Sequence, residues 1–288
     1  MKQSTFAFEK ETPKVSAKSA SKPSGYKGLY AFHKYWGKKP HEIIGFLIET
    51  LSEPNAVVVD PFVGSGICAR ESVTRKRKFI GIDISPLSVQ LTSLLASPPC
   101  LHDLKSAYKV IEQECREQIM SSYSMNDGGT ATHYLWDEAE LTSVWTKAKA
   151  GRSRVEREPT EFDRKLIDSF AKSDGLTVRA PRFFSNSRIN ANPKMTWDDI
   201  LTKRAQSNIQ LLLNAISDSP TNVRQSLELC LTAASGQMTK MVFAVTGRGK
   251  TKGKSSDKVE VGSWVIGYWR PKVPVSYTHL TLPTTPYV

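Results

Sequence analysis

The chain has 288 residues, of which 39% are hydrophobic and 24% are charged, as expected for a globular protein of one or two domains. Its formal net charge of +12 favours a polyanionic partner such as nucleic acid, although some basic proteins bind none. No apolar run reaches the ~20 residues that span a bilayer, the N-terminus lacks a signal-peptide core, and the four cysteines form no CxxC pair. We therefore expect a cytoplasmic protein without a membrane segment, a metal site or disulfides.

Residues 1–27 are rich in lysine and serine and predict a mobile basic tail. After them, hydrophobic patterns predict five elements in chain order. These are a helix over Ile43–Leu51, a strand over Ala56–Val59, a helix over Ile67–Thr74, a strand over Phe79–Ile82 and a helix over 104–122. The first strand is continuously apolar, which is typical of a strand buried on both faces of a parallel sheet. The four consecutive basic residues Arg75–Lys78, between the second helix and the second strand, are expected to form a solvated turn.

A glycine-rich turn, "DPFVGSG" over 60–66, joins the first strand to the helix after it. Gly64 and Gly66 allow tight backbone geometry and close approach of a ligand, which the N–H groups at the start of the helix would face. Asp83 ends the second strand, where a carboxylate can accept hydrogen bonds from both hydroxyls of a ribose. Because the turn lacks GxxxxGK[ST] and GxGxxG, it suits a nucleoside without phosphates, such as S-adenosylmethionine (SAM).

This turn resembles the SAM-binding motif of the DNA methyltransferases that modify adenine N6 or cytosine N4. The stretch "FIGIDISPLSV" is similar to the acidic motif of their second strand. The stretch "HKYWGKKPHEIIGFLIETL" is similar to the Lys-Pro segment and helix that line the methionine side of their pocket. The stronger resemblance covers residues 28–100. A weaker one, to a longer subgroup with an inserted region, covers 195–271 through "LTKRAQSNIQLLLNAI", "GQMTKM" and "GSWVIGYW".

The resemblance implies a doubly wound, Rossmann-like α/β fold with an inserted, largely helical region. It also implies SAM as cofactor and methyl transfer to an exocyclic amino group of adenine or cytosine in DNA. The SAM-binding residues that it implies are Trp36, Lys39, Pro40, Asp60, Pro61, Phe62, Gly64, Ser65, Gly66, Asp83, Ile84 and Pro86. His33, Tyr35 and Trp36 would form either one wall of the pocket or an aromatic cluster that anchors the chain to the core. A restriction-modification system, with a restriction endonuclease as partner, fits the family.

The catalytic motif of the family is Asp/Asn/Ser-Pro-Pro followed by an aromatic residue, which positions the amine and stacks on the flipped base. Its nearest counterpart here is Ser97-Pro98-Pro99, but Cys100 replaces the aromatic residue and the stretch follows the glycine turn too closely. A Pro-Cys nucleophile for cytosine C5 is a second interpretation, and a plain helix-ending Pro-Pro is a third, which we favour. We therefore expect the catalytic motif to lie beyond this chain.

Residues 28–122 are expected to form the SAM-binding part of the methyltransferase domain, and 123–200 an irregular insertion that could recognise the target. Region 201–274 predicts two amphipathic helices, over 201–217 and 221–241, and a return to the methyltransferase domain. The basic residues expected to contact DNA phosphates are Lys203, Arg204, Arg248, Lys250, Lys252 and Lys254. Residues 275–288 resemble translated sequencing-adapter sequence, so we expect an artefactual tail; the alternative is a genuine disordered one.

Two other functions stay open at this point. Some tRNA guanosine N2 methyltransferases share a similar glycine turn, but they usually carry an N-terminal RNA-binding domain, and few residues precede the first strand here. The other alternative is a fragment that binds SAM or DNA but transfers no methyl group. Methyl transfer to DNA or to tRNA separates the first alternative from the main interpretation, and SAM binding without turnover would support the second.

Overall fold

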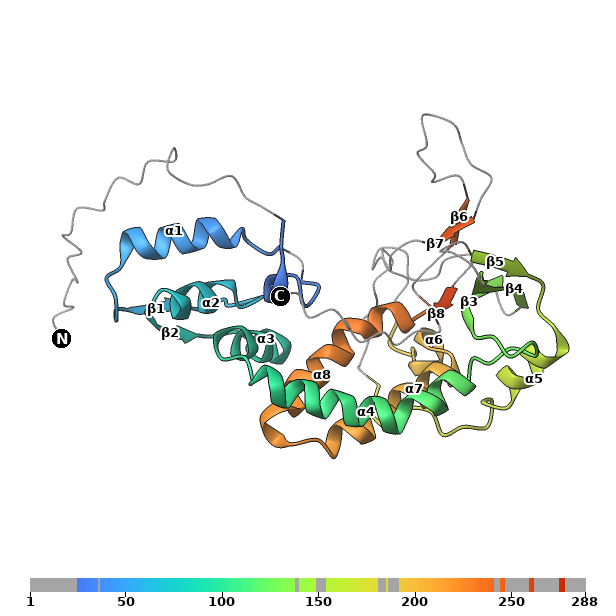
Figure 1. The fold of residues 1–288 in the computed structure, drawn as a ribbon. Helices are drawn as coiled ribbons and strands as arrows, with labels where there is room; N and C mark the ends of the chain where they lie inside the picture. Colours follow the sequence, from blue (N-terminus) through green and yellow to red (C-terminus); the bar gives the residue numbers. More distant parts are fainter. Residues whose placement is uncertain are drawn as a thin grey trace. The chain divides into compact units, whose positions relative to one another are not determined.

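The computed structural model describes residues 25–35, 37–137, 140–148, 154–180, 185, 192–240, 244–246, 259–261 and 275–277, the last three stretches as backbone. These residues form two compact units. Unit 1 ends at Pro99 and unit 2 begins at Cys100, and each is described by itself (Figure 1). The fold is mixed α/β, with many helices and small sheets. None of the described helices is both long and apolar enough to cross a membrane.

Unit 1 alternates helices with two parallel strands. Its elements are the 3-10 helix η2 (Gly28–Tyr30), α1 (His41–Leu51), β1 (Val57–Asp60), α2 (Ile67–Thr74), β2 (Lys78–Gly81) and α3 (Pro86–Ala96). Strands β1 and β2 pair in parallel, from Val57 opposite Lys78 to Asp60 opposite Gly81. The expected helix over Ile67–Thr74 is confirmed, and the other expected helix and strands of this unit are present with ends shifted by one or two residues.

The expectation that the first strand is buried on both faces is wrong for the described part of the chain. Helix α2 packs against β1 and β2, but three apolar side chains of these strands and one directly after β2 remain more than half exposed. They are Val57, Val59, Ile80 and Ile82. We call them the open sheet face. They stay exposed because a sheet of two strands with helices packed on one side has an unprotected second side.

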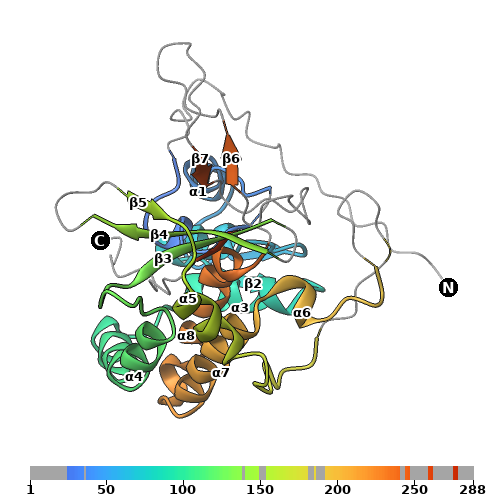
Figure 2. The same ribbon diagram turned by 90° about the vertical axis from the view of Figure 1, so that its right-hand side faces the viewer.

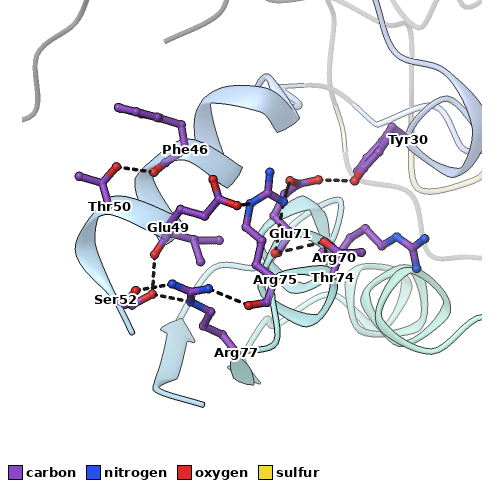
Figure 3. A network of polar contacts seen from close by, with 11 residues as sticks. Tyr30, Phe46, Glu49, Thr50, Ser52, Arg70, Glu71, Thr74, Arg75 and Arg77 are labelled. Carbon is purple, nitrogen blue, oxygen red and sulfur yellow. Dashed lines mark hydrogen bonds and ion pairs between the residues drawn. The ribbon is translucent and has the colours of Figure 1, made fainter. Parts of the chain in front are cut away.

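A polar network joins α1 to α2 and to the turn after α2 (Figure 3). Glu71, which is 2% exposed, accepts hydrogen bonds from the hydroxyl of Tyr30 and from Arg75. Arg75 also pairs with Glu49 of α1 at 3.2 Å, and Arg77 donates to the hydroxyl of Ser52 at 3.1 Å. Two of the four residues expected in a solvated basic turn therefore hold unit 1 together.

Unit 2 contains a helical layer and an antiparallel sheet. Its elements are α4 (Leu101–Ser121), β3 (Ala131–Asp137), β4 (Glu140–Lys147), β5 (Arg154–Arg157), α5 (Glu161–Asp168), α6 (Trp197–Ile200), α7 (Lys203–Ser217), α8 (Thr221–Ser235), η4 (Gly236–Met238), β6 (Ala244–Thr246), β7 (Val259–Val261) and β8 (Val275–Tyr277). The sheet has the strand order β5-β4-β3-β8, and β6 pairs with β7. Figure 2 shows α4, α7 and α8 together on one side of the sheet.

The observed structure of unit 2 differs from two expectations drawn from the sequence. Residues 131–157, expected to be irregular, form three antiparallel strands, because Tyr134, Val144 and Trp145 point into a core although polar residues flank them. Helix α4, assigned above to the SAM-binding part, buries Ala107, Ile111, Cys115 and Ile119 in the core of unit 2; the spacing of four residues places them on one helix face. At the expected artefactual tail, the backbone of β8 pairs with β3.

Candidate cofactor site

The site is built at the carboxyl ends of the two parallel strands. The N–H of Ile82 donates to the carbonyl of Asp60 at 2.9 Å, and the N–H of Val63 donates to the carbonyl of Ile82 at 3.1 Å. The two chains therefore remain paired beyond the last strand residues. As a result, the glycine turn that follows β1 and the acidic segment that follows β2 lie side by side.

The glycine turn needs glycine at two positions. Gly64 has φ +51° and Gly66 has φ +78°, conformations that residues with a side chain rarely adopt. A Cβ on Gly66 would lie 2.8 Å from the backbone Cα of Thr92 in α3, a distance that no real Cβ contact tolerates. Gly66 also donates its N–H to the carbonyl of Val63 at 2.9 Å. The second glycine is therefore required both for the turn and for the close packing of α3.

Asp83 braces this turn. One carboxylate oxygen accepts the N–H of Gly64 at 2.9 Å, and the other accepts the N–H of Ser85 at 2.9 Å. These N–H groups, Ser85 first, lower the pKa of Asp83 below its usual value, so the side chain is an anion at neutral pH. Each carboxylate oxygen has two lone pairs and can accept more than one hydrogen bond.

Apolar side chains flank the carboxylates. Asp60 accepts the N–H of Phe62 at 3.0 Å, which turns the chain sharply after β1. The side chain of Phe62 is 85% exposed, and that of Ile84, directly after Asp83, is 101% exposed. These two side chains offer a surface for a flat apolar group such as a nucleobase.

The remaining expected cofactor residues lie at several different places in unit 1. Ser65 is 9% exposed within the turn, Pro86 is the first residue of α3, and Pro40 is the N-cap of α1. Lys39 has an exposed side chain, and Trp36 lies outside the described residues. It is instead Lys38, half-buried, that organises this segment.

The described residues between Gly25 and Pro40, which we call the strap, are linked by hydrogen bonds to one another and to Glu71 of α2. The ammonium of Lys38 donates to the carbonyls of Tyr30 at 2.7 Å and His33 at 2.5 Å, and its own carbonyl accepts the hydroxyl of Tyr26 at 2.9 Å. Burial lowers the pKa of Lys38 and, together with Glu71, raises the pKa of Tyr30 to about 12. A cavity of about 10 Å³, lined by strap residues together with Ser65, Ile67, Leu91 and Leu95, separates the strap from the helices.

Two residues near the turn, Thr92 and Ser88, were not among the expected cofactor residues, and a third, Tyr35, was expected either in the pocket wall or in an anchoring aromatic cluster. The hydroxyl of Thr92 is buried without a hydrogen-bond partner among the described residues, and it would lie 3.1 Å from a Cβ on Gly66. Ser88 is fully buried, and Tyr35 lies over Gly64. The signal for two of them was present in the sequence, since Ser85, Ser88 and Thr92 recur at helical spacing after Asp83.

The weak catalytic candidates lie at the end of unit 1. Helix α3 ends at Ala96, with Ser97 as its C-cap, and Cys100 is the N-cap of α4. Ser97, Pro98 and Pro99 therefore form the connection between two helices, as the helix-ending interpretation expects.

The expected DNA contact by Arg204 is contradicted. Its side chain is 2% exposed, and its guanidinium lies 4.3 Å from the ring centre of Tyr123 and 4.0 Å from that of Tyr134. The same group donates to the carbonyl of Ser122 at 3.2 Å. Arg204 therefore fills the core of unit 2, where cation–π contacts replace water, and it is not available to a phosphate.

The other basic residues expected at DNA are less informative. Lys203 is paired with Asp198 at 3.0 Å, with 36% of its side chain exposed. Arg248, Lys250, Lys252 and Lys254 lie outside the described residues. Contact of these five with DNA stays a prediction.

Comparison with known proteins finds a family match that includes this part of the chain. A family model described as DNA methylase, of the N6/N4 methyltransferase type, matches residues 3–93. Neither the curated proteins nor the solved structures contain a match to the chain. The matched residues include β1, the glycine turn, β2 and Asp83. This part of the chain is therefore similar to DNA methylases of the N6/N4 type.

Proposed function

We propose that unit 1 binds SAM at the glycine turn and that the protein acts in SAM-dependent methylation of an exocyclic amino group, adenine N6 or cytosine N4, in DNA. The observation that carries this proposal is the brace between Asp83 and the N–H of Gly64, at 2.9 Å. It fixes an anionic hydroxyl acceptor beside a turn whose two glycines have positive φ angles. When bound, SAM supplies a methyl group on a positively charged sulfur.

The residues of the turn fit such a ligand. Tyr35 and Thr92 pack where side chains on Gly64 and Gly66 would stand, and Thr92 holds a buried hydroxyl without a partner among the described residues. The exposed rings and chains of Phe62 and Ile84 can flank an adenine, while Asp83 accepts the ribose hydroxyls. Together these groups hold and orient a nucleoside through its polar and apolar sides.

The same arrangement supports the expected fold of the domain. A parallel pair, β1 and β2, joined by α2, is the repeating element of doubly wound α/β sheets, in which ligands lie beyond the carboxyl ends of the strands. We propose that unit 1 is the first such element of a Rossmann-like sheet. The open sheet face supports this, since parallel sheets are ordinarily covered on both sides.

The test is binding followed by transfer. Equilibrium dialysis with methyl-labelled SAM should show saturable binding to the whole chain. Label transfer is then measured on unmethylated DNA and, in parallel, on tRNA. Transfer to adenine or cytosine in DNA supports the full proposal, and binding without transfer restricts the protein to the cofactor-holding role. Absence of SAM binding, or transfer to tRNA alone, would contradict it.

A further inference from the structure

Tyr35 covers the most open part of the glycine turn. A Cβ on Gly64 would lie 3.3 Å from Cε1 of Tyr35 and 3.4 Å from its hydroxyl oxygen. The edge of the ring therefore lies against the position that a side chain on Gly64 would occupy. This is the surface that the absence of a side chain on Gly64 would otherwise leave open to a ligand.

A single hydrogen bond fixes the ring in this position among the described residues. The hydroxyl of Tyr35 lies 3.2 Å from the hydroxyl of Ser88, and either group can donate. Ser88 is fully buried in the first turn of α3, one turn after Ser85, whose N–H is bound by Asp83. The ring is thereby connected to the same carboxylate segment that braces Gly64.

The strap around Tyr35 is held more firmly than Tyr35 itself. On one side, Tyr30 is bound through its hydroxyl to Glu71 (Figure 3) and stacks on His41 with ring centres 4.1 Å apart. On the other, Lys38 binds back to the carbonyls of Tyr30 and His33. A side chain that moves between two fixed points can uncover the turn without unfolding the strap.

We infer that Tyr35 and Ser88 form a latch over the cofactor turn: the ring opens to admit the ligand and closes again over its amino-acid part. The inference rests on the proposed SAM site and adds to it a step that controls entry and release. A neutral hydrogen bond shifts an equilibrium by roughly two- to tenfold. Loss of the Tyr35–Ser88 bond should therefore shift the ratio of open to closed turn by a similar factor.

The experiment is stopped-flow kinetics of SAM binding to the whole chain. Tyr35→Phe keeps the ring but removes the hydroxyl, and Ser88→Ala removes its partner. Each variant should raise both the association and the dissociation rate constants of SAM by roughly two- to tenfold, while the dissociation constant changes less than either rate. The double variant should match the single ones, because one bond is lost in every case. Ser93→Ala, with a hydroxyl bound to the carbonyl of Val89 in the same helix, is the matched control.

The outcomes separate the latch from the site. Wild-type rates in both Tyr35→Phe and Ser88→Ala, with SAM bound normally, reject the latch and leave the site intact. Multiplicative effects in the double variant also reject it, because the two hydroxyls would then act independently. If the wild-type chain binds no SAM, the site itself fails and the latch with it.

Discussion

In each of the two units, an aspartate carboxylate accepts a hydrogen bond from the backbone N–H of a glycine, but the surroundings of this contact differ. In unit 1, Asp83 accepts the N–H of Gly64 at 2.9 Å; in unit 2, Asp127 accepts the N–H of Gly129 at 3.0 Å. The first turn joins the ends of two parallel strands and is packed by α3, whereas a Cβ on Gly128 in the second would meet open space. The comparison shows that an aspartate–glycine contact alone does not indicate a ligand site. The contact in unit 1 is a candidate cofactor site because it lies at the ends of two parallel strands and α3 packs on it.

The units also differ in how they bury apolar groups. Unit 2 has a continuous core drawn from α4, β3, β4, α7 and α8. Unit 1 has a smaller set of buried apolar side chains around α2 and α3, and its open sheet face remains exposed. The unit that carries the candidate site is therefore the one with the less complete core, and four measurements test this contrast.

The largest expected effect is that of Gly66→Ala. Strain at φ +78° and overlap with Thr92 together should destabilise unit 1 by roughly 2–4 kcal/mol. Gly128→Ala, at φ +80° in open space, should cost only about 1 kcal/mol. Amide hydrogen exchange followed by mass spectrometry reports each unit separately. Equal losses in the two variants would contradict the close packing of α3 on the turn.

Arg204→Ala should be next in size. It removes the contacts with Tyr123 and Tyr134 and leaves a cavity in the core, so unit 2 should lose about 2–3 kcal/mol. Lys203→Ala, in the preceding position but with a partly exposed ion pair, should cost at most about 0.5 kcal/mol. Urea unfolding of both variants measures the difference. A larger loss for Lys203→Ala would show that the assignment of these two residues is reversed.

Acid should destabilise unit 2 through Asp163, whose side chain is fully buried. Burial raises the pKa of Asp163, but hydrogen bonds from Arg157 and Thr160 outweigh it, and the net pKa is lowered. The carboxylate therefore stabilises the fold above its unfolded pKa of about 3.9, and this is lost as the pH falls through the lower folded pKa. We expect a loss of about 1–2 kcal/mol over that range.

Urea unfolding at a series of pH values from about 6 to about 3 measures this loss. In Asp163→Asn the profile should be flatter, because the titrating group is gone. An unchanged slope in that variant would assign the acid sensitivity to other carboxylates.

The smallest expected effect concerns the open sheet face. Ile80 is 53% exposed, so Ile80→Thr should change the stability of unit 1 by less than about 0.5 kcal/mol. Ile67→Thr, at a position that is 4% exposed, should cost about 2 kcal/mol or more. Hydrogen exchange again gives both values. A cost above about 1 kcal/mol for Ile80→Thr would mean that this face is covered in solution.

Local signals predicted much of unit 1. The helix over Ile67–Thr74 follows from a glycine turn and a helical pattern in the adjoining residues, and the parallel strands follow from two apolar runs of suitable length. The proximity of the glycine turn and Asp83 at the ends of the paired strands was likewise predictable from their order, whereas their contacts with SAM stay a proposal. These features depend on residues that are close in sequence.

The predictions that were wrong concern features that depend on contacts between residues distant in the sequence. Burial of Arg204 requires Tyr123 and Tyr134, which lie about 70 or more residues away in the chain, so a run of basic residues looked like a surface feature. The strands over 131–157 contain many polar residues, and their pairing partners decide their structure. The exposed state of Val57 and Val59 depends on what covers a sheet, which no pattern within the strand specifies.

Titration calorimetry with SAM on the wild-type chain, Asp83→Asn and Asp127→Asn tests the central claim most directly. We expect one saturable site per wild-type chain, an affinity at least about tenfold weaker in Asp83→Asn, and unchanged affinity in Asp127→Asn, which alters the corresponding turn of unit 2. No binding to the wild-type chain, or equal affinity in Asp83→Asn and the wild type, would contradict the assignment of the braced glycine turn as the cofactor site.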